Sequence, residues 1–264
     1  MRLFAGKSGF AFGSVSVFLS CLNLKYPLSA YIIEIDFGIR QQPQLGQVMA
    51  AHFQCEVHAF DPSPVSVDWY EALPADHPLK MLPNYHFHPY GVSGHDGTTT
   101  LFEYNWGQVS TIRYPAIMRD CGKIGDPAVK CKIIPMDVQG RHELPVKTMK
   151  SIRRELGHED RSVSAVKIDI EGSEYGFLYS MLDDYVCPDF VEQLTLEWHH
   201  YPIDVRYGEG SSPDINQLAT MLHACGLKSF WFHDPTGWKA GDKLFHDLGL
   251  NDMRYNLQSF HRSK

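Results

Sequence analysis

Hydrophobic positions along this chain follow two periods, which alternate from one end of the sequence to the other. Short apolar runs that stop at Gly, Pro or an acid are typical of buried strands, whereas apolar residues three or four positions apart are typical of amphipathic helices. These patterns predict strands at 31–37, 56–60, 85–92, 98–104, 132–136, 161–170, 191–198, 227–232 and 253–260. They predict helices at 44–53, 146–156, 175–182 and 215–225.

Strands that alternate with helices indicate an α/β fold with a doubly wound, mostly parallel sheet that closes on an antiparallel pair. We expect 98–104 to form a hairpin with 85–92. Residues 105–130 carry Gly, Pro and Cys without a clear period, which predicts an insertion or a lid. The sequence therefore predicts one domain over 30–264, interrupted by that insertion and preceded by an apolar segment, 1–29.

Composition narrows the class of protein. The 264 residues are 44% hydrophobic, enough to bury one large core. The net charge of -7 and the pI of about 6.0 argue against a nucleic-acid partner, because such proteins normally carry a basic face.

The first residues resemble the start of a secretory or membrane-anchored chain. Arg2 and Lys7 precede an uncharged run, 8–24, which Lys25 closes. Three interpretations stay open: a short signal anchor, a signal peptide, or a truncated start. We expect membrane association through 8–24 and favour the secretory pathway or a membrane anchor slightly over the cytoplasm.

Cysteine and histidine positions give no metal motif. The 14 histidines are scattered without the spacing of a zinc site, and no C-x-x-C occurs among the six cysteines. Cys121 and Cys131 bracket a loop and could pair in an oxidising compartment, but we favour free buried thiols.

Acidic residues lie at the carboxyl ends of five of the predicted strands. In an open α/β sheet, ligands bind outside the carboxyl ends of the strands, so these acids predict one ligand cleft. The acids are Asp36, Asp61, Asp137, Asp169 with Glu171, and Glu197.

Two of these positions carry the most information. Asp169 and Glu171 end a buried strand and precede Gly172, which lets the backbone turn sharply. Asp61 ends the second strand, where an acid accepts hydrogen bonds from ribose hydroxyls in Rossmann-like proteins. The alternatives are a helix-capping turn for the first pair and a turn aspartate before Pro62 for the second. The first strand ends in D-F-G rather than G-x-G-x-x-G, which favours a cofactor without a pyrophosphate.

The ordered motifs resemble those of the FkbM-type methyltransferases. They are D-F-G, V-H-A-F-D-P-S, H-P-Y-G-V-S and V-K-I-D-I-E-G-S-E-Y. With C-E-V-H and L-E-W-H, the chain is most similar to the methyltransferase-like protein 24 group. The resemblance implies a Rossmann-like, seven-stranded sheet that binds S-adenosylmethionine.

The same resemblance implies roles for individual residues. Asp36 and Gly38 would border the methionine part of the cofactor, and Asp61 would hold the ribose. Gly91 and Val92 would lie near the adenine, while Asp169 and Glu171 would face the methyl group and the acceptor. One departure is Gln42, which stands where such methyltransferases usually have a second glycine.

We expect O-methylation of a hydroxyl on a small molecule or glycan. A hydroxyl acceptor needs a general base or a metal to remove its proton, and the candidates are Asp169, Glu171, Glu197 and His199. We favour a base, so no resident metal is expected. A catalytically silent relative and a nicotinamide oxidoreductase are the alternatives; the missing glycine fingerprint argues against the second.

Overall fold

The computed structural model describes residues 33–39, 43–104, 109–111, 117–120, 132–135, 137–199, 215–233 and 255–263. The apolar segment 1–29, the loop residue Gln42, Cys121 and Cys131 lie outside these ranges. Some described strand residues, among them Asp36 and His199, are described in their backbone only.

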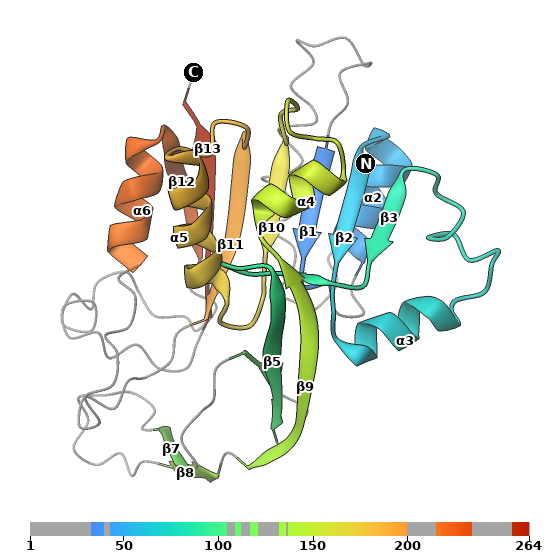
Figure 1. The fold of residues 1–264 in the computed structure, drawn as a ribbon, viewed down its shortest axis with the longest axis vertical. Coiled ribbons are helices and arrows are strands. Elements are labelled where there is room, and N and C mark those ends of the chain that lie inside the picture. The colour runs from blue at the N-terminus through green and yellow to red at the C-terminus, as the bar shows by residue number, and fades with distance from the viewer. Residues whose placement is uncertain are drawn as a thin grey trace.

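The main sheet contains seven strands in the described part of the chain, in the order β12-β13-β11-β10-β1-β2-β3 (Figure 1). Neighbours from β3 to β11 pair in parallel, and β13 runs antiparallel to both β11 and β12. The parallel strands thus follow the Rossmann order, which reverses between β1 and β10. The bounds are β1 Ile33–Phe37, β2 Glu56–Phe60, β3 Tyr85–His88, β10 Ala165–Ile168, β11 Gln193–His199, β12 Leu227–His233 and β13 Tyr255–Arg262.

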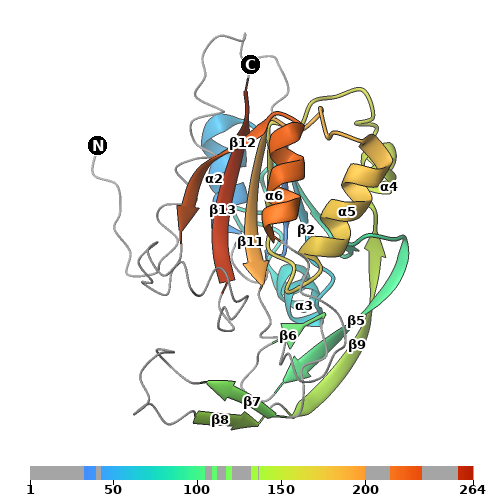
Figure 2. The same cartoon turned by 90° about the vertical axis from the view of Figure 1, so that its left-hand side faces the viewer.

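Helices cover both faces of this sheet, which confirms the predicted α/β fold (Figure 2). One face packs Met49 and Ala50 of α2 against Val57 and Ala59. The other face carries α4, α5 and α6 over a larger core centred on Phe37. The bounds are α2 Gln44–Phe53, α3 Pro64–Ala72, α4 Met149–Glu155, α5 Glu174–Tyr185 and α6 Ile215–Ala224.

A smaller sheet, in the order β4-β9-β5-β6, extends from the edge at which the parallel strands end (Figure 1). The strands β5 and β9 form its long antiparallel pair, and β7 and β8 form a separate two-stranded sheet. The bounds are β4 Gly91–Val92, β5 Gly97–Tyr104, β6 Val109–Ser110, β7 Ile117–Asp120, β8 Lys132–Pro135 and β9 Val138–Lys147.

The smaller sheets correct three sequence predictions. The predicted strand 85–92 is two strands in different sheets, because Pro89 has no N–H to continue the ladder. The strand at 98–104 pairs with β9 rather than with 85–92. The strand at 132–136 belongs to β8, so Asp137 is an exposed residue before β9 and not an acid at the edge of the main sheet.

Four elements were not predicted. Two of them, β6 and β7, are short strands within the predicted insertion, and the other two are β9 and α3. The strand β9 was missed because Gly140 and Pro145 break its apolar alternation, and its last residues were assigned to the helix that begins at Met149. Helix α3 was missed because the prolines after Asp61 were interpreted as stop signals, whereas Pro64 occupies the first turn, where proline is tolerated. The predicted bounds of α2 and β2 are confirmed.

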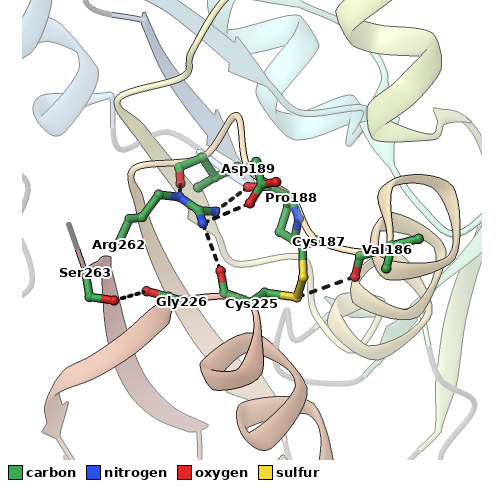
Figure 3. A network of polar contacts seen from close by, with 9 residues as sticks. Val186, Cys187, Pro188, Asp189, Cys225, Gly226, Arg262 and Ser263 are labelled. Atoms are coloured by element: carbon green, nitrogen blue, oxygen red, sulfur yellow. Dashed lines mark hydrogen bonds and ion pairs between the residues drawn. A yellow bond between two sulfur atoms is a disulfide. The ribbon is translucent and has the colours of Figure 1, made fainter.

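A disulfide joins the end of α5 to the end of α6 (Figure 3). Cys187 and Cys225 are bonded across a sequence separation of 38 residues. The expectation of free thiols is therefore wrong for this pair, although it is confirmed for buried Cys55. Two cysteines that follow different helices and lie so far apart leave no local signal in the sequence.

Arg262 on β13 forms hydrogen bonds to residues on both sides of this disulfide (Figure 3). Its guanidinium donates to the carbonyls of Pro188 and Cys225, at 2.6 and 2.8 Å, and to the Asp189 carboxylate at 3.1 Å. Its Nε donates to the Val191 carbonyl at 2.9 Å. Arg262 thus connects both segments that the disulfide links to the last strand of the sheet.

We expect loss of this disulfide to destabilise the fold markedly. Replacing both Cys187 and Cys225 with Ser should lower the free energy of unfolding by about 4 kcal/mol, because a closed loop of this length restricts the unfolded chain. Urea unfolding measures the change. The double variant should also be insensitive to reductant, whereas an unchanged stability would contradict the prediction.

Among the described helices, none combines the length and the apolar character required to cross a membrane.

Candidate functional site

The ends of β1 and β10 meet without space for a side chain. Gly38 has φ of +80°, and a Cβ at this position would lie 1.6 Å from the Asp169 carbonyl oxygen. The Asp169 N–H donates to the Phe37 carbonyl at 3.2 Å, and the Gly38 N–H donates to the Phe60 carbonyl at 2.9 Å. The predicted cofactor residue Gly38 and the predicted catalytic residue Asp169 are therefore adjacent.

Asp61 follows β2 at the same edge and is 5% exposed. Its Oδ1 accepts hydrogen bonds from the Ser63 N–H at 2.9 Å and the Ser63 hydroxyl at 2.6 Å, and its own N–H donates to the His88 carbonyl. The carboxylate thus shapes the turn into α3, which was the alternative interpretation of this residue. A carboxylate has further acceptor positions, so the turn does not use up its capacity to bind a ligand.

Gly91 and Val92 are both buried, and they lie close to Asp61 in space. A Cβ at Gly91 would lie 3.0 Å from Cγ of Pro62, so this segment packs directly on the turn after β2. β4 joins the smaller sheet to this edge, because its register pairs Gly91 with Val146 of β9. The positions that the resemblance assigns to ribose and adenine are therefore neighbours.

A strained turn follows β10. Glu171 has φ of +54° and Gly172 has φ of +106°. A left-handed conformation costs an ordinary residue about 1–2 kcal/mol, and such strain is concentrated at functional sites. Glu174 stabilises this turn, and its side chain is fully buried. Its Oε1 accepts hydrogen bonds from the backbone N–H groups of Ile170 and Gly172, both at 3.1 Å.

Thr111, the residue directly after β6, also contacts this turn. The backbone N–H and the hydroxyl of Thr111 both donate to the Glu171 carbonyl, at 3.0 and 3.1 Å. The Ser173 hydroxyl donates to Thr111 Oγ1 at 3.0 Å. Neither Thr111 nor Glu174 was predicted as a site residue. Glu174 had a signal, since it lies within the conspicuous run I-D-I-E-G-S-E, but Thr111 is more than fifty residues away along the chain.

For the remaining predicted site residues, the structure describes fewer contacts or only the backbone. Asp169 is partly buried, and its Oδ2 lies 3.9 Å from Nζ of Lys167. Glu197 is partly buried on β11, one strand beyond β10. Asp36 and His199 lie on the last residues of β1 and β11, with only their backbone described. Tyr175 is buried against Trp198, and burial raises the pKa of its hydroxyl, with a further contribution from Glu174.

A model of the methyltransferase FkbM domain matches residues 48–228. The chain belongs to the FkbM methyltransferase family. The match covers β2, β10 and β11 and so contains Asp61, Gly91, Val92, Asp169, Glu171, Glu197 and His199. It confirms that the protein is a methyltransferase and leaves no support for a nicotinamide oxidoreductase.

Solved structures of other methyltransferases are similar to this FkbM chain, at low identity. The N-terminal domain of human METTL16, in complex with SAH, is 9% identical with a TM-score of 0.42, over 95% of this chain and 68% of that one. The antibiotic-resistance methyltransferase Kmr is 11% identical with a TM-score of 0.41, over 98% of each chain. Fibrillarin from Aeropyrum pernix, with bound S-adenosyl-L-methionine, is 9% identical with a TM-score of 0.38, over 93% and 73%. The sequence has no significant match among curated proteins.

Proposed function

We propose that this FkbM-family chain transfers the methyl group of S-adenosylmethionine to a hydroxyl acceptor. The observation that carries the proposal is the adjacency of Gly38, Asp61 and Asp169 at one edge of a Rossmann-ordered sheet. Such an edge is where α/β proteins bind their ligands. The motifs around these residues are also those that resemble the methyltransferase-like protein 24 group, to which we assign the chain.

In this proposal the cofactor lies across the ends of β10, β1 and β2. The Asp61 carboxylate accepts hydrogen bonds from the ribose hydroxyls, and Gly91 with Val92 borders the adenine. Asp36 and Gly38 border the methionine part, where a side chain larger than hydrogen at position 38 would also collide with Asp169. We propose one domain over 30–264 with an insertion at 105–130, and the smaller sheet lies on the acceptor side of the cofactor.

Methyl transfer is an in-line displacement, so most of the acceleration comes from the alignment of the two substrates. A lone pair of the acceptor oxygen attacks the methyl carbon, the carbon–sulfur bond breaks, and its electron pair stays on sulfur. The acceptor proton passes to a carboxylate or an imidazole. We propose Asp169 as this base, because it is partly exposed beside Gly38, with Glu171, Glu197 and His199 as the other groups of the acceptor site.

We propose a small molecule or a glycan as the acceptor and the secretory pathway as the compartment. The net charge of -7 disfavours a nucleic-acid substrate. The Cys187–Cys225 disulfide supports an oxidising compartment, where such bonds persist. Membrane association through 8–24 accords with that compartment.

Calorimetric titration with S-adenosylmethionine, S-adenosylhomocysteine and NAD tests the proposal. We expect the first two to bind and NAD not to bind. Asp61→Ala should weaken S-adenosylmethionine binding about 100-fold, because two charge-assisted hydrogen bonds are lost.

Ser63→Ala is the matched control, since it removes a partner of Asp61 on the turn and keeps the carboxylate. It should leave affinity within about threefold if the carboxylate itself binds the ribose. If the folded wild-type chain binds neither S-adenosylmethionine nor S-adenosylhomocysteine, the protein is a catalytically silent relative. If Asp61→Ala and Ser63→Ala lose equal affinity for S-adenosylmethionine, Asp61 only stabilises the turn and does not bind the ribose.

A further inference from the structure

A second polar cluster lies at the opposite end of β2 from Asp61. Glu56 opens the strand, and His58 follows two residues later, on the same face of the sheet. His158 comes from the loop after α4, some hundred residues away along the chain. His58 and His158 are 5% and 2% exposed, so both imidazoles are buried, whereas the Glu56 side chain is 26% exposed.

The three side chains converge on a small volume. Oε1 of Glu56 lies 3.2 Å from Nε2 of His58 and 3.3 Å from Nε2 of His158. All three potential ligand atoms lie within 4.8 Å of one another. Ligands about 2.0–2.1 Å from a tetrahedral zinc ion are about 3.3 Å apart, so two edges of the required tetrahedron are already present.

Other residues hold two of these ligands, His58 and Glu56, in orientation. Nδ1 of His58, on the far side of the ring from Glu56, lies 3.0 Å from Nε2 of His88. Nη2 of Arg161 donates to Oε2 of Glu56 at 2.9 Å, which leaves Oε1 facing the two imidazoles. Metal-bound histidines and carboxylates usually have such outer partners, which fix the ring and its tautomer.

Burial and hydrogen bonds shift the pKa values of all three side chains. Burial lowers the pKa of His58 to about 4 and also lowers the pKa of His158. Burial alone would raise the pKa of Glu56, but hydrogen bonds from Arg161 and His58 outweigh it and keep the carboxylate charged.

We propose that Glu56, His58 and His158 bind a zinc ion, with a water molecule in the fourth position. Two nitrogen ligands and one oxygen suit Zn²⁺ rather than Mg²⁺ or Ca²⁺, which prefer oxygen alone. The five residues of β2 separate this site from Asp61 by about 16 Å, so the ion takes no part in the methyl transfer. It fastens the loop that leads into β10 to the start of β2, and thereby supports two strands of the cofactor edge.

Zinc titration of the full chain, purified without a polyhistidine tag and stripped with a chelator, tests the site. We expect one Zn²⁺ per chain, competing with a chromogenic chelator, and a rise in Tm of about 5–10 °C at a hundredfold excess over the dissociation constant. Co²⁺ in its place should give the visible absorption bands of a tetrahedral ion. Mg²⁺ should produce neither effect.

Glu56→Gln and His158→Gln should each lower zinc affinity at least about tenfold. His86→Gln is the control and should keep the zinc affinity. The His86 ring stacks on His58, with centroids 5.0 Å apart, but His86 does not belong to the ligand set.

Zinc binding that is unchanged in both ligand variants would place the ion on other histidines and overturn the proposal. Absence of zinc binding and of tetrahedral Co²⁺ bands in the folded wild-type chain would show that Glu56 serves only as a hydrogen-bond acceptor. Should a variant fail to fold, X-ray absorption of the Co²⁺-loaded wild-type chain decides, since a shell without imidazoles contradicts the site.

Discussion

Gly38→Ala should abolish stable folding or lower the free energy of unfolding by more than about 4 kcal/mol, an exceptional value for one methyl group. The new Cβ would lie 1.6 Å from the Asp169 carbonyl oxygen, and this atom belongs to the backbone directly after β10 rather than to a flexible side chain. Relief of the collision requires β1 and β10 to separate at the edge where the sheet order reverses. Circular dichroism and urea unfolding measure the loss.

Gly157→Ala provides the matched control. Gly157 also has a positive φ, +68°, but a Cβ there would meet nothing within 4 Å. Its substitution should therefore cost only the backbone strain of about 1–2 kcal/mol. Similar losses in the two variants would mean that conformation rather than the contact with Asp169 requires a glycine at position 38.

Glu174→Ala should destabilise the protein by about 4 kcal/mol. Its buried carboxylate accepts two backbone hydrogen bonds, from Ile170 and Gly172, and hydrogen bonds to a charged group contribute about 1.5–3 kcal/mol each. Loss of these bonds also releases the turn that contains Glu171. We therefore expect weaker binding of S-adenosylmethionine in the same variant, measured by calorimetry alongside urea unfolding.

Glu174→Gln keeps an acceptor oxygen at the same place and should recover much of the stability. If Gln and Ala destabilise equally, the negative charge rather than the acceptor geometry supports the turn. If neither variant is destabilised, the turn is held by Thr111 and the backbone alone.

Local sequence patterns predicted the helices and strands whose bounds depend on nearby residues. The bounds of α2 and β2 were predictable because Pro43 and Pro62 limit them on either side. The placement of Asp169 and Gly38 at one edge of the sheet was also predictable, because the carboxyl ends of parallel strands share that edge.

Features that depend on distant pairing were not predictable. The strand β9 gains its partner β5 some forty residues earlier, and no local apolar alternation marks the stretch around Gly140. Thr111 and Glu171, or Glu56 and His158, meet only after the sheet has formed. A single sequence records residue types and spacing, but it does not record which distant residues share a surface.

The place of β13 between β11 and β12 has a consequence for synthesis on the ribosome. β12 precedes β13 in the sequence, yet β13 lies between β12 and β11 in the sheet, so β12 pairs only with the later strand. The parallel strands can pair as soon as β11 has emerged, whereas β12 must wait beside an open sheet edge until β13 inserts. A nascent chain stalled between these two strands would expose the unpaired edge of β11 and be prone to pair with other chains.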